Sequence, residues 1–172
     1  MARVLIVGGG CRGRQLAARL VDDGHAVRIV TRTETGRAAI EASGAECLIG
    51  TPDRLATLRG ALDGVTIACW MLATARGAPE QVQALHGARL QAWLGQAVDT
   101  TMRGFVYEAP AGNAIAARGE PVVRAIAARN LIPIELVRAN PDDTDGWLAQ
   151  ANAAVATLLD PGKSGGVRYP ET

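Results

Sequence analysis

The sequence contains almost no lysine. Lysine and arginine together number 18 among 172 residues, and Lys163 is the only lysine. Aspartate and glutamate number 17, so the formal net charge is only +1. A protein that binds nucleic acid by neutralising phosphates normally carries a clear excess of positive charge. We therefore expect no nucleic-acid partner for this chain.

Long apolar runs and a cleavable leader are also missing. A membrane-spanning helix needs about 20 consecutive apolar residues, and no stretch of this sequence reaches that length. The residues after Met1 already have the pattern of a core strand, so no secretory signal is expected. The three cysteines, Cys11, Cys47 and Cys69, have no metal-site spacing, and their number is odd. These features predict a cytoplasmic protein with reduced thiols, no membrane contact and no metal site.

Short runs rich in valine and isoleucine alternate with helical patterns along the whole chain. Such runs, in which polar and apolar residues do not strictly alternate, are typical of parallel strands covered on both faces. The expected strands are Arg3–Val7, Ala26–Thr31, Glu46–Ile49, Val65–Cys69, Gly104–Tyr107 and Ile132–Arg138. The expected helices are Arg14–Asp23, Thr35–Ser43, Pro52–Leu62, Pro79–Val98, Pro121–Asn130 and Asp145–Leu159.

This alternation predicts an α/β fold with a single doubly wound parallel sheet of about six strands and helices on both faces. Right-handed crossovers then give the strand order 3-2-1-4-5-6. We expect one domain over residues 1–160, followed by a flexible Gly/Pro-rich tail over residues 161–172. Because little sequence follows the sixth expected strand, we expect no separate substrate domain.

The most specific motif directly follows the first expected strand. Gly8, Gly10 and Gly13 form G-x-G-x-x-G between that strand and a helix. In this setting the first glycine permits a tight turn, the second lets the backbone approach a pyrophosphate, and the third lets the helix pack against the strand. The N–H groups of the helix N-terminus then face the phosphates. The motif predicts a dinucleotide site that includes Cys11 and Arg12.

The end of the second expected strand indicates which dinucleotide is bound. An NAD site normally has an acidic residue there, which bonds to the ribose 2′-OH. This chain instead has Arg32, between Thr31 and Thr33. A guanidinium pairs bidentately with a 2′-phosphate, and Arg12 is a second cation that could reach it. The prediction is NADP, and the nearby Glu34 keeps NAD open as the alternative.

Four stretches of the sequence resemble the atypical short-chain dehydrogenases/reductases, in particular the NmrA-like and NAD(P)H-binding proteins. They are Val4–Leu16, Val27–Arg32, Arg103–Tyr107 and Ile132–Arg138. The resemblance extends from Arg3 to Asn140 and implies a Rossmann fold that binds NAD(P) for oxidoreduction. The glycine motif is closer to the general G-x-G-x-x-G than to the group's own version, because Val7 stands where that version has its first glycine.

Catalytic members of that group use a Tyr-x-x-x-Lys pair, whose lysine lowers the tyrosine pKa so that the tyrosine can act as acid and base. This chain lacks the pair, because its only lysine lies in the tail and Ala111 stands four residues after Tyr107. Where the group often has serines, this chain has Glu108 and Ala109. Tyr107 and Glu108 are therefore weak catalytic candidates, and an ion pair between Glu108 and an arginine is the simpler interpretation.

The ligand crevice of such a sheet lies at the carboxyl ends of its strands. The loops expected to line it are Trp70–Ala78, Glu108–Arg118 and Ala139–Gly146. Trp70, Met71 and Leu72 are candidates to wall the nicotinamide side of the site, with core packing as their alternative role. A redox role for Cys11 is a minor alternative, and His86 is expected to be a surface or packing histidine.

Three functions remain open. The first is an NADP-preferring oxidoreductase with a small quinone- or flavin-like acceptor, because hydride transfer from the cofactor needs little chemistry from the protein. The second is a non-catalytic dinucleotide-binding redox sensor or regulatory protein, which the missing catalytic residues favour. The third, a sugar-nucleotide epimerase or dehydratase, is disfavoured by the absence of Tyr-x-x-x-Lys. Monomer and homodimer are both compatible with the sequence.

Overall fold

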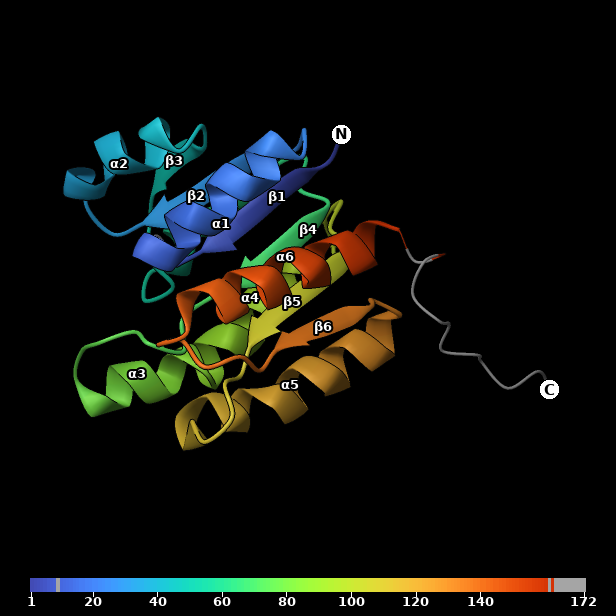
Figure 1. Ribbon diagram of the computed structural model, residues 1–172. Helices are drawn as coiled ribbons and strands as arrows, with labels where there is room; N and C mark the ends of the chain where they lie inside the picture. The colour runs from blue at the N-terminus through green and yellow to red at the C-terminus, as the bar shows by residue number, and fades with distance from the viewer. Residues whose placement is uncertain (9, 161, 163–172) are drawn as a thin grey trace.

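The computed structural model describes residues 1–8, 10–160 and 162. Within them, six parallel strands form one sheet in the order β3-β2-β1-β4-β5-β6 (Figure 1). The strands are β1 (Arg3–Val7), β2 (Ala26–Thr31), β3 (Glu46–Ile49), β4 (Ile67–Trp70), β5 (Gly104–Glu108) and β6 (Ile134–Val137). The predicted α/β sheet and its strand order are confirmed. The predicted tail lies outside the described residues, apart from Gly162.

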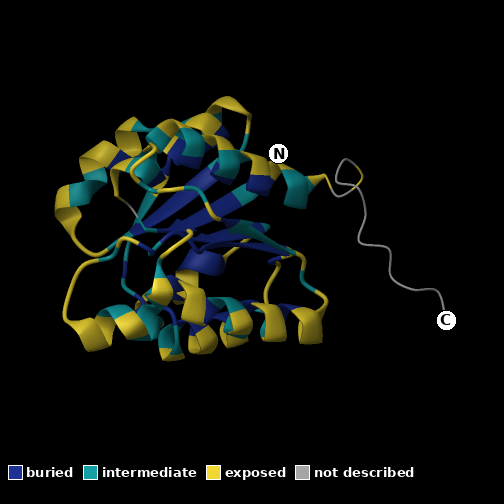
Figure 2. Ribbon diagram, turned by 60° about the horizontal axis from the view of Figure 1, so that its bottom comes forward, coloured by how far each residue is buried: buried dark blue, intermediate teal, exposed yellow. Residues whose placement is uncertain are grey.

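Helices cover both faces of this sheet. They are α1 (Cys11–Asp22), α2 (Arg37–Ala42), α3 (Pro79–Leu85), α4 (Ala88–Ala97), α5 (Ala114–Asn130) and α6 (Thr144–Leu159), with 3₁₀ helices η1 (Glu34–Gly36) and η2 (Leu55–Leu62). One hydrophobic cluster packs α1, α2 and α6 on one face, and a second packs η2, α4 and α5 on the other. Figure 2 shows the sheet as a buried layer between helices with exposed outer sides.

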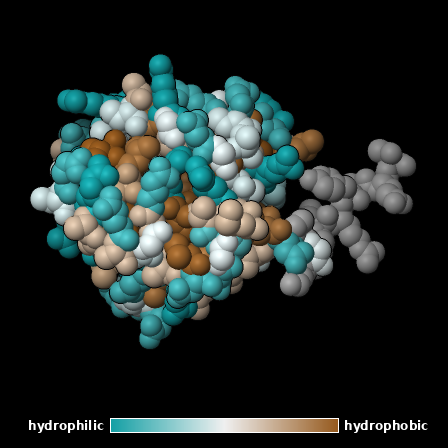
Figure 3. Space-filling model, turned by 90° about the horizontal axis from the view of Figure 1, so that it is seen from above, coloured by the Kyte–Doolittle hydropathy of each residue, from teal (hydrophilic) through white to brown (hydrophobic). Residues whose placement is uncertain are grey.

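The central strand β1 explains why the expected strands lack polar–apolar alternation. Val4 and Ile6 belong to one hydrophobic cluster, while Leu5 and Val7 belong to the other. All four side chains are buried, because successive residues of a strand point to opposite faces. The only large hydrophobic side chains exposed among the described residues are Met1 and Leu131. On the face of the molecule drawn in Figure 3, hydrophobic residues form small groups between hydrophilic ones.

The expectation of one continuous helix over Pro79–Val98 is wrong. The chain forms α3 and α4 with a break at His86 and Gly87, where Gly87 has the non-helical angles φ −136° and ψ −108°. The buried His86 ring bonds to groups outside the helix, which are described below. This tertiary bonding overrides a helical periodicity that continues through the break in the sequence.

The expectation that a helix begins at Pro121 is also wrong. α5 begins at Ala114, capped by Asn113, whose side chain accepts a hydrogen bond from the Ala116 N–H at 3.0 Å. Pro121 lies inside the helix, although proline usually favours the first turn. The expected helix Pro52–Leu62 is instead the 3₁₀ helix η2. Smaller shifts occur elsewhere, since α1 begins earlier than expected, and β4 and β6 begin later.

No helix in the described part of the chain is both long enough and apolar enough to cross a membrane.

Candidate functional site

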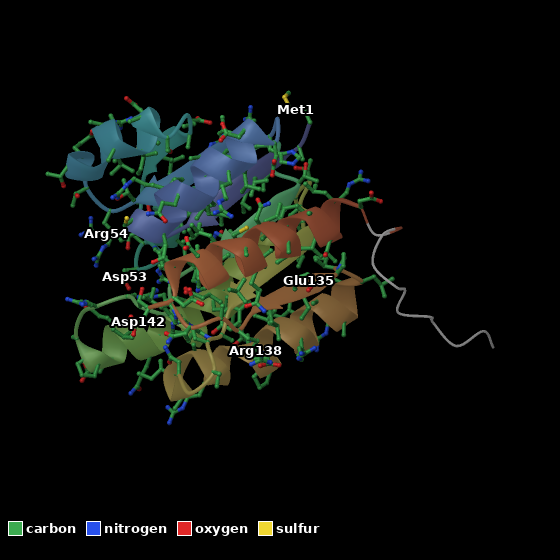
Figure 4. The ribbon with its side chains drawn as sticks, viewed as in Figure 1. Met1, Asp53, Arg54, Glu135, Arg138 and Asp142 are labelled. Atoms are coloured by element: carbon green, nitrogen blue, oxygen red, sulfur yellow. The ribbon has the colours of Figure 1, made fainter. Side chains whose placement is uncertain are left out.

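A cavity of about 650 Å³ opens at the carboxyl ends of the first four strands. It is lined by the glycine turn with the start of α1, and by residues of the segments that follow β2, β3 and β4. Because β1 lies between β2 and β4, this position is the switch point of the strand order, where doubly wound sheets bind ligands. In Figure 4, Asp53, which lines the cavity, and Asp142, which follows β6, both lie at this end of the sheet.

The cavity is confined to one half of the crevice predicted from the sequence. Among the described residues, none from the loops 109–113 and 139–143 after β5 and β6 lines it. Side chains tie the β5 side to the β4 loop: the Asn113 amide donates to the Ala73 carbonyl at 3.0 Å, and Glu108 accepts from the Ala73 N–H at 2.9 Å. These contacts separate the cavity from the β5–β6 edge.

The glycine turn needs two of its glycines for its own backbone geometry. Gly8 has φ +124°, and a Cβ there would overlap the Met71 carbonyl. A Cβ on Gly13 would overlap the Gly8 carbonyl, so a glycine is needed where α1 crosses the turn that follows β1. Gly10 is the N-cap of α1, and no side chain caps the helix. The α1 N-terminus therefore presents N–H groups suited to an anion beside the cavity.

Arg32 is an exposed cation at the rim of the cavity, directly after β2. It makes no hydrogen bond or ion pair with another residue in the described part of the chain. Thr31 and Thr33 line the cavity beside it, and the Thr33 hydroxyl lies 2.6 Å from that of Thr35. The segment after β2 thus offers one unpaired guanidinium and several hydroxyls to a ligand.

Arg12 also lines the cavity, but its guanidinium bonds on the side of β4 and β5. Its Nη1 lies 2.9 Å from Glu108 Oε1, and its Nη2 donates to the Thr74 hydroxyl at 2.7 Å. The guanidinium carbon lies 4.6 Å from the centre of the Trp147 ring, in cation–π geometry. Glu108 and Thr74 thus hold the Arg12 guanidinium beside β4 and β5, and its reach to the phosphate at Arg32 stays a prediction.

Glu108 is fully buried, and both its carboxylate oxygens accept hydrogen bonds. Oε1 accepts from Arg12 and from the Trp147 Nε1–H at 2.9 Å, and Oε2 accepts from the Ala73 N–H at 2.9 Å. The ion pair with an arginine, which was the simpler interpretation of this residue, is confirmed. Glu108 does not line the cavity, so its arrangement joins β5 to α1, α6 and the β4 loop.

Tyr107 lies on the opposite face of β5 and is buried. Its hydroxyl donates to the Ala116 carbonyl at 2.7 Å and lies 2.7 Å from His86 Nδ1. Burial raises the pKa of Tyr107 well above its usual value. A Cβ on Gly119 would overlap the tyrosine ring and hydroxyl. Tyr107 does not line the cavity, so this geometry gives it no contact with a ligand there.

His86 is buried beside Tyr107, with its Nε2 3.2 Å from the Leu72 carbonyl. Burial lowers the pKa of His86, although the Leu72 carbonyl and the Glu108 charge oppose that shift. The expected role as a packing histidine fits this position. His86 therefore links the β4 loop to β5 at the break between α3 and α4.

The three candidates at the end of β4 separate into two groups. Met71 and Leu72 line the cavity. Trp70 does not line it: the indole is buried, donates to the Leu85 carbonyl at 3.0 Å and lies 5.1 Å from the Trp93 ring centre. The alternative role of Trp70, in the core, is the one its contacts support.

Sequence reasoning missed several residues of the site. Trp147 and residues 50–53 line the cavity although no expected loop included them, whereas Thr74 and Arg76 belong to the expected loop Trp70–Ala78 without having been singled out. Trp147 belongs to the first turn of α6, far from the glycine turn in sequence, and only the packing of α6 beside α1 brings it there. Cys11, as expected, lies at the cavity, where its Sγ accepts a hydrogen bond from Gln15 at 3.5 Å. In the described part of the chain, no group of three or more potential ligand residues could hold a metal ion.

Comparison with known proteins identifies relatives by fold but not by sequence. No protein-family profile matches the chain, and no curated protein matches it. Solved structures match well. The UDP-glucose 4-epimerase of Thermotoga maritima, in complex with UDP-glucose, has a TM-score of 0.69 and 12% identity, over 79% of this chain and 54% of that one.

Two further structures illustrate these matches. A UDP-glucuronic acid 4-epimerase from Bacillus cereus, in complex with NAD and a sugar nucleotide, has a TM-score of 0.64 and 13% identity, over 79% of this chain and 55% of that one. The vestitone reductase of alfalfa has a TM-score of 0.58 and 15% identity, over 80% and 56%. The chain thus spans about half the length of these proteins. At such low identity the likeness shows that the Rossmann-type fold is shared.

Proposed function

We propose that this chain is an NADP(H)-binding oxidoreductase related to the atypical short-chain dehydrogenases/reductases, with the cofactor held in the cavity at the switch point. One observation carries the proposal: an uncapped helix N-terminus in a glycine turn and an unpaired arginine after β2 line the same cavity. Its volume of about 650 Å³ falls within the range of about 300–1,000 Å³ found for small-molecule sites.

The residues that line the cavity fit such a cofactor segment by segment. The N–H groups at the start of α1 would hold the pyrophosphate. The pyrophosphate would approach over Gly10, because the space beside this residue is open: a Cβ built there meets nothing within 4 Å. Arg32 and the hydroxyls of Thr31 and Thr33 would hold the ribose and its 2′-phosphate. Met71 and Leu72 would wall the nicotinamide side. When bound, the cofactor supplies the hydride.

The contacts of the two catalytic candidates decide which reduction suits this chain. Tyr107 and Glu108 are buried, engaged with protein groups and absent from the cavity lining. An acceptor that takes its proton from water fits this arrangement, and small quinones or flavins are such acceptors. Sugar-nucleotide epimerisation, the activity named for several neighbours by fold, fits it poorly, because Tyr107 is the only tyrosine in the part of the chain that the structure describes and it does not line the cavity.

The same observation supports a second candidate function. A cavity with cofactor-binding features whose lining leaves out both catalytic candidates, Tyr107 and Glu108, suits a non-catalytic redox sensor or regulatory protein. The two functions share the cofactor site and differ only in turnover. We favour the enzyme because hydride transfer between a bound cofactor and a flat acceptor needs orientation rather than proton transfer by the protein.

Titration of the protein with NADPH and with NADH tests the cofactor site, with the affinity measured by calorimetry. We expect tighter binding of NADPH, and no binding of either cofactor at millimolar concentration would refute both functions. NADPH oxidation in the presence of menadione, a soluble ubiquinone analogue or FMN then separates them. Turnover with any of these supports the enzyme, whereas binding without turnover across the panel supports the sensor.

A further inference from the structure

The turn after β2 contains an acidic residue that faces away from the cavity. Five of the six residues from 31 to 36 line the cavity, and Glu34 is the exception. Its neighbours on both sides, Thr33 and Thr35, face the ligand space and lie within hydrogen-bond distance of each other. The backbone therefore brings Glu34 close to the rim while its carboxylate lies elsewhere.

Arg37 accounts for the position of that carboxylate. Arg37 Nε donates to Glu34 Oε2 at 2.7 Å, and Nη2 donates to Glu34 Oε1 at 3.0 Å. This bidentate arrangement fixes orientation as well as charge. The hydrogen bonds from Arg37 lower the pKa of the Glu34 carboxyl, so the side chain is a full negative charge. Arg37 also lies 3.5 Å from Glu41.

A released Glu34 carboxylate would act directly on cofactor choice. An acidic residue near the end of the second strand accepts a hydrogen bond from the ribose 2′-OH of NAD, and it repels the 2′-phosphate of NADP. Glu34 lies only two residues beyond Arg32, so its charge would oppose the guanidinium that we assign to that phosphate. Holding the carboxylate outside the cavity removes both effects.

We infer that Arg37 is a specificity-determining positioning residue: by keeping the Glu34 carboxylate outside the cavity, it makes the site prefer NADP(H) over NAD(H). This inference rests on the proposed function, since it concerns the same cofactor site. Arg37 itself does not line the cavity, so it acts through Glu34 and makes no contact with the ligand.

The exposure of the pair makes the inference testable without unfolding the protein. The side chains of Glu34 and Arg37 are 70% and 39% exposed. Exposed ion pairs contribute little to stability, so Arg37→Gln should leave the fold intact. Arg124 offers a control, because it is an exposed arginine that pairs with the partly buried Glu120 at 2.9 Å on α5 and does not line the cavity.

The experiment measures dissociation constants for NADPH and NADH by calorimetry in the unmodified protein and five variants: Arg37→Gln, Arg37→Lys, Glu34→Gln, the double variant Glu34→Gln/Arg37→Gln and Arg124→Gln. We expect Arg37→Gln to reduce the preference for NADPH by about two- to fivefold, the size typical of an exposed charge interaction. In the Glu34→Gln background the same substitution should have no effect. Arg37→Lys keeps the positive charge but lacks the bidentate guanidinium, so its preference for NADPH should be intermediate. Arg124→Gln should have the same preference as the unmodified protein.

Three results would overturn the inference, and they can be told apart. Equal weakening of both cofactors by Arg37→Gln would show a merely structural role. The same loss of preference with and without Glu34 would show that Arg37 contacts the phosphate itself. If the unmodified protein binds neither cofactor, the proposed function fails and the inference fails with it.

Discussion

Removing the Glu108 carboxylate should destabilise the protein strongly, because three donors depend on it. In Glu108→Ala the Trp147 and Ala73 N–H groups lose their acceptor in the protein interior, and each such unsatisfied group costs about 1–3 kcal/mol. Arg12 loses its ion-pair partner, although its side chain is 18% exposed and water recovers part of its solvation. Loss of one partner of a buried pair typically costs about 3–5 kcal/mol, and we expect a value in that range.

Equilibrium unfolding in urea, followed by tryptophan fluorescence, measures this change. Trp70, Trp93 and Trp147 are all buried, so the signal reports the loss of both cores. Glu108→Gln keeps the volume and one acceptor oxygen, so we expect about half of the loss. Glu135→Ala on the neighbouring strand β6 is the matched control; this glutamate is only partly buried, and the expected change is below about 1 kcal/mol.

A double-mutant cycle isolates the ion pair from the other two bonds. Arg12→Ala and Glu108→Ala should each be costly, and their combination should cost less than the sum by about 1–3 kcal/mol. If Glu108→Ala lies within about 1 kcal/mol of the unmodified protein, the assignment of Glu108 as the buried link between β5, α1 and α6 is wrong.

Three further predictions concern the cavity and its supports. Arg32→Ala should weaken NADPH binding at least about tenfold, the value of a charge-assisted hydrogen bond, and should leave NADH binding little changed. Calorimetry measures both affinities, with Arg59→Ala, at an exposed arginine outside the cavity lining, as the control. Equal losses for both cofactors would contradict the assignment of Arg32. Burial lowers the pKa of His86, so the unfolded chain binds this proton before the native protein does. The contribution of neutral His86 to the free energy of unfolding should therefore be fully present above the ordinary histidine pKa of about 6.5 and decline as pH falls below it. Urea titrations between pH 7 and 5 should show a smaller change of the unfolding free energy with pH for His86→Gln, and an unchanged pH dependence would refute this. Gly13→Ala should lower the stability of the protein and abolish cofactor binding, because its Cβ would overlap a backbone carbonyl. Gly95→Ala in α4 is the control: a Cβ there meets nothing within 4 Å, so it should stabilise the protein by about 0.4–1 kcal/mol. A tolerated Gly13→Ala would show that the turn can relax.

Sequence and structure agree where local patterns carry the information. The runs of valine and isoleucine predicted six strands, and the four inner strands β1, β2, β4 and β5 are largely buried, because a strand covered on both faces must be apolar throughout. The turn predicted at Gly8 and Gly13 is present, because positive φ and a backbone overlap exclude other residues there. Where the prediction failed, at Gly87 and at Pro121, contacts or capping groups distant from the expected boundary outweighed the local preference.

By itself, the sequence determined the order and type of most elements, the glycine turn and the cation after β2, because these depend on neighbouring residues. Only the tertiary structure decided the partners of the charged groups. Arg12 meets Glu108 across 96 residues, and no local pattern distinguishes that pairing from a contact with a phosphate. The same holds for Trp70, because the face of β4 from which its side chain projects decides whether it packs in the core or lines the cavity. The ion-pair and packing partners of these side chains are distant in sequence, and they come into contact only once the sheet has formed.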